Sequence, residues 1–252
     1  MITIKNSESI LKMKEAGKIV GLVHDKLKGL IEPGISLIEL DNQAEKLIRK
    51  LGAKPSFKGY GGFPRTICAS VDEQVIHGIP SKRKLREGEI VSIDVGAYYL
   101  GYHGDAAFTA AVGTISEEKA RLIEITEKSF YEGFKLAKAG NRLGDISHSI
   151  EMVVRQAGFY VVKEFVGHGI GAELHEDPAI PNYGPPGRGP LLEPGMTLAI
   201  EPMVNMGTES IIILDDGWTV VTKDKKPSAH YEHTILITES EPVILTKGIE
   251  FE

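Results

Sequence analysis

The stretch Ile90-Val-Ser-Ile-Asp-Val-Gly-Ala-Tyr-Tyr-Leu-Gly-Tyr-His-Gly-Asp-Ala-Ala-Phe-Thr109 has the pattern of two β-strands joined by a turn near Leu100-Gly101. Asp94 and Asp105 each lie inside one of these strands. Aspartate is depleted in strands, and an isolated carboxylate is costly to bury. Because strand side chains alternate between faces, the hairpin can direct both carboxylates to the same side. The rest of the chain must therefore explain why two acids are kept there.

Two further acids interrupt apolar strand patterns in the C-terminal part of the chain. Glu201 lies within residues 198–203, where Pro202 predicts an interrupted ladder. Glu232 lies within the strand pattern of residues 230–238. Four acids that lie near one another need a strong counter-charge to stay ionised, and the strand segments that carry them contain no lysine or arginine. Two divalent metal ions bridged by carboxylates would supply that charge.

His168 is the best candidate for a nitrogen ligand in such a site. Gly167 and Gly169 flank it, and glycines allow the backbone to approach closely and the ring to turn inward. Each residue also has an ordinary interpretation: Asp105 as a turn or edge residue, His168 as a loop histidine, Glu232 as a solvated edge glutamate. The complete set, spread along the chain, favours the metal site.

The order of predicted elements suggests an internal repeat. Helical patterns cover residues 7–30, 36–52, 116–138 and 145–157, and strand patterns follow each helix pair. The stretch at 88–94 matches the one at 195–201, with glycine, isoleucine and the acid in the same register. Chance similarity between amphipathic segments is the alternative. We predict one α/β catalytic domain over residues 1–252, built from two pseudo-twofold-related halves at about 7–112 and 116–238.

The overall composition excludes several classes of protein. The 252 residues are 42% hydrophobic and 25% charged, which is typical of a globular protein with a sizeable core. A net charge of −6 argues against non-specific binding to nucleic acid or to an anionic membrane. Cys68 is the only cysteine, so no internal disulfide and no thiolate zinc cluster can form. We expect a cytoplasmic protein without a membrane span.

Several ordered motifs together resemble a known family. They are Ile93-Asp-Val-Gly96, Gly101-Tyr-His-Gly-Asp105, Gly167-His-Gly-Ile-Gly171, Ile200-Glu-Pro202, Glu232-His-Thr234, His77-Gly-Ile-Pro80 and Leu174-His-Glu-Asp-Pro178. Essentially the whole chain is similar to type I methionine aminopeptidases, in their bacterial single-domain form. The resemblance implies the pita-bread α/β fold, with a central curved antiparallel sheet around a dinuclear site. It also implies removal of N-terminal methionine, before a small second residue, from peptides and nascent proteins.

The resemblance assigns roles residue by residue. The implied metal ligands are Asp94, Asp105, His168, Glu201 and Glu232. Glu201 would also shuttle a proton from the attacking water to the leaving amine, with the water activated by the metals. His175 would stabilise the developing oxyanion, and His77 would contact the substrate backbone. Oxygen ligands with one imidazole favour Mn²⁺, Fe²⁺, Co²⁺ or Zn²⁺ over Ca²⁺.

The resemblance also implies a pocket for the methionine side chain. Together with His77 and His175, its walls would be Tyr60, Phe63, Cys68, Leu174 and Trp218. Aromatic and sulfur-bearing side chains suit a thioether, although the same residues also suit an ordinary core. Leu174 departs from the family, where an aromatic residue is frequent at this position. Asp72 and Ser228 match positions near a monovalent-cation site in relatives. A monomer with transient ribosome association is expected.

Three other interpretations remain open from the sequence alone. A proline-specific aminopeptidase or prolidase shares the fold but carries a separate N-terminal domain, whereas here the repeat begins at once. A catalytically inactive relative that binds protein or RNA would have lost ligands, and all five are present. A non-enzymatic metal-binding module would not need His77 and His175.

Overall fold

The predicted hairpin forms the middle of the structure. In the computed structural model, which describes residues 1–248, β4 (Ile90–Tyr99) pairs antiparallel with β5 (Tyr102–Ala111) over its whole length. Leu100 and Gly101 connect the strands with φ angles of 52° and 90°. Two positive φ angles are typical of the tight turn whose twist matches that of the flanking strands. The hairpin is thus confirmed at the predicted position.

A large antiparallel sheet is built outward from this hairpin. Within residues 1–248 it has nine strands in the order β1-β4-β5-β14-β9-β7-β8, with β2 paired to β4 and β15 paired to β14. The remaining bounds are β1 (Lys54–Pro55), β2 (Ile67–Val71), β7 (Gly167–Gly169), β8 (Glu176–Ile180), β9 (Thr197–Ile200), β14 (Glu232–Leu236) and β15 (Val243–Ile244). Since β5 and β14 are neighbours, the N-terminal and C-terminal parts of the chain meet in the middle of one sheet.

The other strands of residues 1–248 form two three-stranded antiparallel sheets. One has the order β13-β10-β6, and the other has the order β11-β12-β3. Their bounds are β3 (Gln74–Ile76), β6 (Tyr160–Val161), β10 (Met203–Asn205), β11 (Ile211–Ile213), β12 (Val220–Thr222) and β13 (Ser228–His230).

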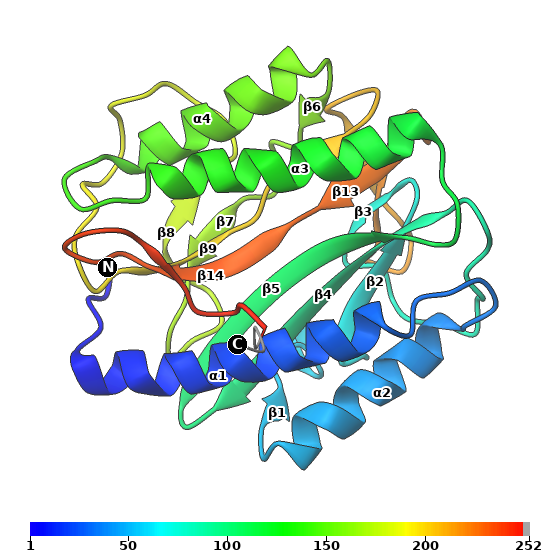
Figure 1. Cartoon of the computed structure of the whole chain (residues 1–252), viewed down its shortest axis with the longest axis horizontal. Helices are drawn as coiled ribbons and strands as arrows, with labels where there is room; N and C mark the ends of the chain where they lie inside the picture. The colour runs from blue at the N-terminus through cyan, green and yellow to red at the C-terminus, as the bar shows by residue number, and fades with distance from the viewer. Residues whose placement is uncertain (249–252) are drawn as a thin grey trace.

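Four α-helices of the described part of the chain cover the large sheet in pairs. They are α1 (Ser7–Lys28), α2 (Leu37–Lys50), α3 (Glu117–Lys135) and α4 (Leu143–Gln156), and a short 3₁₀-helix, η1, spans Tyr60–Gly62. Figure 1 shows α1 and α2 along one half of the sheet and α3 and α4 along the other. The Ser36 hydroxyl accepts a hydrogen bond from the N–H of Glu39 and so caps the start of α2. None of the described helices is long and apolar enough to cross a membrane.

Each helix pair has its own apolar core against the sheet. Val91, Ile93 and Val95 are fully buried and belong to the core beneath α1 and α2. A second core beneath α3 and α4 includes Ile200 and Ile150. Because Asp94 alternates with the apolar residues of β4, its carboxylate faces the opposite side of the sheet. The helices thus account for one face, and the acids gather on the other.

The C-terminal strands differ in detail from the sequence prediction. Residues 196–204 form two strands, β9 and β10, because the ladder breaks at Glu201 and Pro202, as the proline indicates. Residues 230–238, predicted as one strand, divide between β13 and β14 at Tyr231. The short strands β7 and β8 were not predicted, because three to five residues containing glycine or proline give too little periodicity to identify.

Candidate metal centre and adjoining pocket

Three acids surround Ala107 on the face of the sheet away from the helices. In the strand register Ala107 stands opposite Asp94 of β4 on one side and opposite Glu232 of β14 on the other. Asp105 lies two residues from Ala107 and therefore shares its face. Alanine is small, so its methyl group leaves space between the three carboxylates. The long-range pairing of β5 with β14 brings Glu232 to the hairpin.

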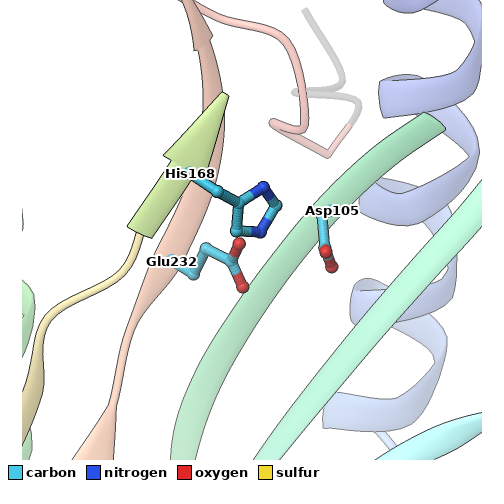
Figure 2. Close-up of side chains that lie close together, drawn as sticks. All are labelled: Asp105, His168 and Glu232. Carbon is cyan, nitrogen blue, oxygen red and sulfur yellow. The ribbon is translucent and has the colours of Figure 1, made fainter. Parts of the chain in front are cut away.

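His168 and Glu201 approach the same cluster from the C-terminal half. His168 lies on β7 opposite Ala199 of β9, and Glu201 directly follows β9. The Nε2 atom of His168 is 3.6 Å from Oε1 of Glu201. One ligand atom each from Asp105, His168 and Glu232 lie within 4.8 Å of one another. Figure 2 shows these three side chains converging from β5, β7 and β14.

The glycines beside His168 have the function that the sequence suggested. A Cβ atom at Gly167 would collide with the carbonyl oxygen of Ala199, and one at Gly169 with that of Asp177. The strand therefore approaches its neighbours more closely than any other residue would allow. This close packing fixes the backbone on both sides of the His168 ring.

The four acids of the cluster carry strongly raised pKa values. Burial raises the pKa of Asp94 to about 7 and raises the pKa of Glu201 and of Glu232 well above the ordinary glutamate value. Burial, and then the charges of Glu232 and Asp94, raise the pKa of Asp105 in the same direction. Without a counter-charge the cluster therefore favours protonated carboxyls at neutral pH.

Several atoms of the cluster fit a bound cation. Among the described residues, Oδ1 of Asp94, Oδ1 of Asp105 and Oε1 of Glu232 are buried without a hydrogen-bond partner. The Nδ1 atom of His168 lies 2.8 Å from the carbonyl oxygen of Gly169, so that Nδ1–H donates and Nε2 keeps a lone pair. Burial lowers the pKa of His168 to about 4, which keeps the imidazole neutral. Anionic oxygens with a neutral imidazole suit a divalent transition metal.

An apolar pocket adjoins the acids in a cavity of about 150 Å³. Its walls include every residue predicted for the methionine pocket, namely Tyr60, Phe63, Cys68, His77, Leu174, His175 and Trp218. Phe63 and Trp218 pack edge to face, with ring centroids 5.2 Å apart. Asp94, Asp105, His168, Glu201 and Glu232 line the same cavity. Thus all the predicted site residues come together, although their roles remain predictions.

Two histidines at the pocket have distinct local structures. The Nδ1 atom of His175 is 2.7 Å from the Tyr60 hydroxyl, and its ring packs against His168. His77 directly follows β3 with a φ angle of 57°, a left-handed conformation that histidine adopts more readily than most residues. Burial lowers the pKa of His77 to about 4 and also lowers the pKa of His175. Both rings are therefore neutral at neutral pH.

Sequence reasoning missed two residues at this site. Phe57 lines the cavity from the glycine- and aromatic-rich loop before η1. His230 is buried, and its Nε2 atom lies 3.8 Å from Oε2 of Glu201 without a hydrogen-bond partner. Its position two residues before Glu232 is the signal that was available, because residues i and i+2 share a face.

Asp72 and Ser228 are close to each other, as the resemblance requires. The N–H of Ser228 donates to the carbonyl oxygen of Asp72 at 2.8 Å. The Asp72 carboxylate is 2.7 Å from the ammonium group of Lys119. This carboxylate therefore already has a counter-charge from α3, and the monovalent cation stays a prediction.

A comparison with protein families identifies this chain as a metallopeptidase. Residues 11–239 match the model of metallopeptidase family M24. The chain belongs to this family of metallopeptidases, and within it to the methionine aminopeptidases.

Individual relatives support the assignment over nearly the whole chain. The sequence is 56% identical over 247 residues to methionine aminopeptidase 1 of Bacillus subtilis strain 168, covering 98% of this chain and 100% of that protein. The crystal structure of methionine aminopeptidase from Thermotoga maritima superimposes with a TM-score of 0.97 at 49% identity, covering 98% and 100% of the two chains.

More distant members of the family share the architecture. Prolidase from Pyrococcus furiosus matches with a TM-score of 0.78 at 26% identity, covering 98% of this chain and 66% of that one. These matches confirm the pita-bread fold. The higher identity to methionine aminopeptidases favours that activity over the proline-specific alternative.

Proposed function

We propose that this protein is a metal-dependent aminopeptidase that removes N-terminal methionine from peptides and nascent proteins whose second residue is small. The observation that carries the proposal is the convergence of four acids, of which Asp105 and Glu232 are buried, and one neutral histidine beside an apolar pocket. The pocket accommodates an apolar side chain next to the acids that would hold the metals. The relatives that are 56% and 49% identical to this chain are named methionine aminopeptidases.

Asp94, Asp105, His168, Glu201 and Glu232 would hold two divalent ions in this proposal. Mn²⁺, Fe²⁺, Co²⁺ and Zn²⁺ all match the donor set, and the identity of the metal is left open. When bound, the ions would supply Lewis-acid chemistry that acidifies water and polarises a carbonyl oxygen. Their positive charge would also return the four acids to the ionised state.

Glu201 is the residue that we assign to proton transfer. Its carboxylate lies between the Nε2 atoms of His168 and His230, at 3.6 and 3.8 Å. In the metal-loaded site Glu201 would be an ionised carboxylate, which can act as a general base. Glu201 would accept a proton from the attacking water and then deliver it to the leaving amine.

His175 and His77 are proposed to contact the substrate backbone. When the Tyr60 hydroxyl donates to Nδ1, the neutral His175 ring carries its proton on Nε2. That N–H is available to stabilise negative charge on the substrate oxygen. His77, held by its left-handed backbone, would contact the leaving side of the substrate.

The pocket walls are proposed to select methionine. Phe63, Cys68 and Trp218 offer aromatic and sulfur surface that suits a flexible thioether. Leu174, a branched aliphatic residue, is buried at 2% exposure beside them. We keep the small-residue preference at the second position as a prediction from the resemblance.

The wider setting is also proposed. We infer one catalytic domain over residues 1–252, with related halves at about 7–112 and 116–238. We further propose a cytoplasmic monomer that meets nascent chains in transient association with the ribosome. A monovalent cation beside Asp72 and Ser228 remains a prediction.

Peptide hydrolysis by the purified, metal-supplemented protein tests the proposed activity. With added Mn²⁺ or Co²⁺ it should release methionine from Met-Ala-Ser, but not from Met-Lys-Ser, and should not release leucine from Leu-Ala-Ser. Equal turnover of an Xaa-Pro dipeptide would move the assignment to the proline-specific relatives. Absence of turnover with each of the four candidate metals would contradict the proposal.

A further inference from the structure

The two halves of the chain meet along a short seam between β5 and β14. Backbone pairing at this seam joins Glu232 with Ala107 and His233 with Ala106. If the same register continues one residue beyond His233, Thr234 stands opposite Asp105. If it continues two residues before Glu232, His230 stands opposite Thr109. The seam therefore lies between two of the proposed metal ligands, Asp105 and Glu232.

A side chain replaces the backbone ladder at one end of the seam. The Thr234 hydroxyl donates to the carbonyl oxygen of Asp105 at 2.8 Å and accepts from the N–H of Asp105 at 3.0 Å. The Thr234 backbone has other partners, because its N–H donates to the Thr246 hydroxyl and its carbonyl accepts from Leu245. A single buried hydroxyl thus performs the pairing that a backbone amide and carbonyl would otherwise perform.

The opposite end of the seam has the same arrangement with the strands exchanged. The Thr109 hydroxyl of β5 donates to the carbonyl oxygen of His230 and accepts from its N–H, both at 2.9 Å. It also lies 2.8 Å from the Ser92 hydroxyl of β4. One threonine reaches from β14 to β5, and the other reaches from β5 to the end of β13.

These contacts carry a consequence for the metal centre. Both strands of the seam carry a proposed ligand, so the distance between their backbones sets the distance between the Asp105 and Glu232 carboxylates. Thr234 holds the backbone of Asp105 itself, and Thr109 holds His230, two residues before Glu232. We propose that Thr109 and Thr234 are positioning residues that fix the spacing of Asp105 and Glu232 for metal binding, an inference that rests on the proposed metal centre.

The hydroxyl of Thr234 can be removed with little change of shape. Thr234→Val replaces the hydroxyl with a methyl group, whereas Thr234→Ser keeps it. Loss of an outer partner of a metal ligand typically costs about 10- to 100-fold in metal affinity. We expect Thr234→Val to weaken Mn²⁺ binding by about that factor, measured by calorimetric titration of protein from which a chelator has removed the metal. Thr234→Ser should bind Mn²⁺ nearly as well as the wild-type protein.

A matched control separates positioning from general stability. Thr126 is equally buried, but its hydroxyl donates to Leu122 within α3, away from the seam. Thr126→Val should lower the unfolding temperature and leave Mn²⁺ affinity unchanged. If Thr234→Val behaves like Thr126→Val, with lower stability and unchanged affinity, the inference is wrong. If Thr234→Val does not fold, Thr109→Val replaces it with the same expectation.

Failure of the metal centre itself would give a different result. Asp105→Asn removes a proposed ligand and should weaken Mn²⁺ binding in the same titration. Undiminished binding by Asp105→Asn would contradict the ligand assignment. Weak binding by Asp105→Asn together with full affinity in Thr234→Val would contradict only the role of the threonines.

Discussion

Asp94 and Glu201 end two matching stretches of sequence, yet the structure holds them in different ways. Asp94 lies inside β4, with Cys68 of β2 opposite on one side and Ala107 of β5 on the other. Glu201 follows the last residue of β9, where Pro202 ends the ladder. Two strands fix the backbone of Asp94, whereas Glu201 lies at a strand end.

The carboxylates of Asp94 and Glu201 also have different neighbouring groups. Glu201 lies within 4 Å of two imidazoles, those of His168 and His230. Asp94 lies close to the acids Asp105 and Glu232 and has one buried oxygen without a hydrogen-bond partner. Related positions can therefore serve different roles: Asp94 is suited to hold a cation rigidly, and Glu201 is suited to exchange a proton.

Glu201→Gln should have the largest effect on activity if Glu201 transfers the proton and Asp94 only holds the metal. General acid–base catalysis contributes about 10²- to 10⁴-fold to rate, so Glu201→Gln should lower kcat by about that factor. Excess metal should not restore the activity, since the glutamine cannot accept the proton. Methionine release from Met-Ala-Ser measures the effect. Glu209→Gln, at an exposed surface ion pair, is the control, and wild-type turnover in Glu201→Gln would contradict the assignment.

Removal of the metals by a chelator should make the stability of the folded protein depend on pH, because the acids of the cluster have raised pKa values. The pKa of Asp94 rises from 3.8 to about 7 on folding, so between these values the folded state binds more protons than the unfolded state. The stability of the metal-free protein should therefore fall as pH rises from about 4 to 7, by up to about 4 kcal/mol from Asp94 alone.

Thermal unfolding at several pH values measures this dependence on the chelated protein. A saturating divalent ion should abolish the decrease, because it holds the carboxylates ionised in the folded state. Stability of the chelated protein that increases over the same pH range would contradict the raised pKa of Asp94.

Asp94→Asn should affect metal binding before it affects the chemistry. It removes a proposed ligand, so the loss of affinity should reach at least the roughly 10- to 100-fold seen when an outer partner is removed. Unlike Glu201→Gln, this variant should regain part of its activity at high metal concentration. Activity measured against metal concentration distinguishes the two. A lowered kcat at saturating metal with unchanged affinity would reverse the roles assigned here.

Tyr60→Phe should give the smallest effect. The variant keeps the aromatic wall and loses the hydrogen bond to Nδ1 of His175. A typical hydrogen bond contributes about 0.5–1.5 kcal/mol, so kcat should fall by about 2- to 13-fold, with little change in KM. Steady-state kinetics on Met-Ala-Ser test this. A raised KM with unchanged kcat would indicate that Tyr60 acts only as a pocket wall.

The local parts of the fold could be predicted because short segments encode them. Ser36 and Ser116 mark helix starts, Leu100-Gly101 marks the hairpin turn, and Pro202 marks the end of a strand. Acids inside apolar strands indicated the metal centre, because such residues need a specific partner.

Other parts depended on contacts between distant segments. His230 reaches Glu201 because β13 pairs with β10, which begins two residues after Glu201. Tyr60 meets His175 across 115 residues of chain. Strand β7, with only three residues, lacks the periodicity that identifies longer strands. Phe57 became a pocket residue through the path of a loop.

The sequence by itself singled out the side chains that are proposed to hold the metals. Four of them are acids within apolar strand patterns, and the fifth is a histidine between two glycines: Asp94, Asp105, Glu201, Glu232 and His168. The tertiary structure alone decided how these groups meet. The pairing of β5 with β14, and the hydroxyls of Thr109 and Thr234 at its ends, bring together residues more than 100 positions apart. Side-chain periodicity reports the face of a strand, but the neighbour of that strand is chosen by packing of the whole chain.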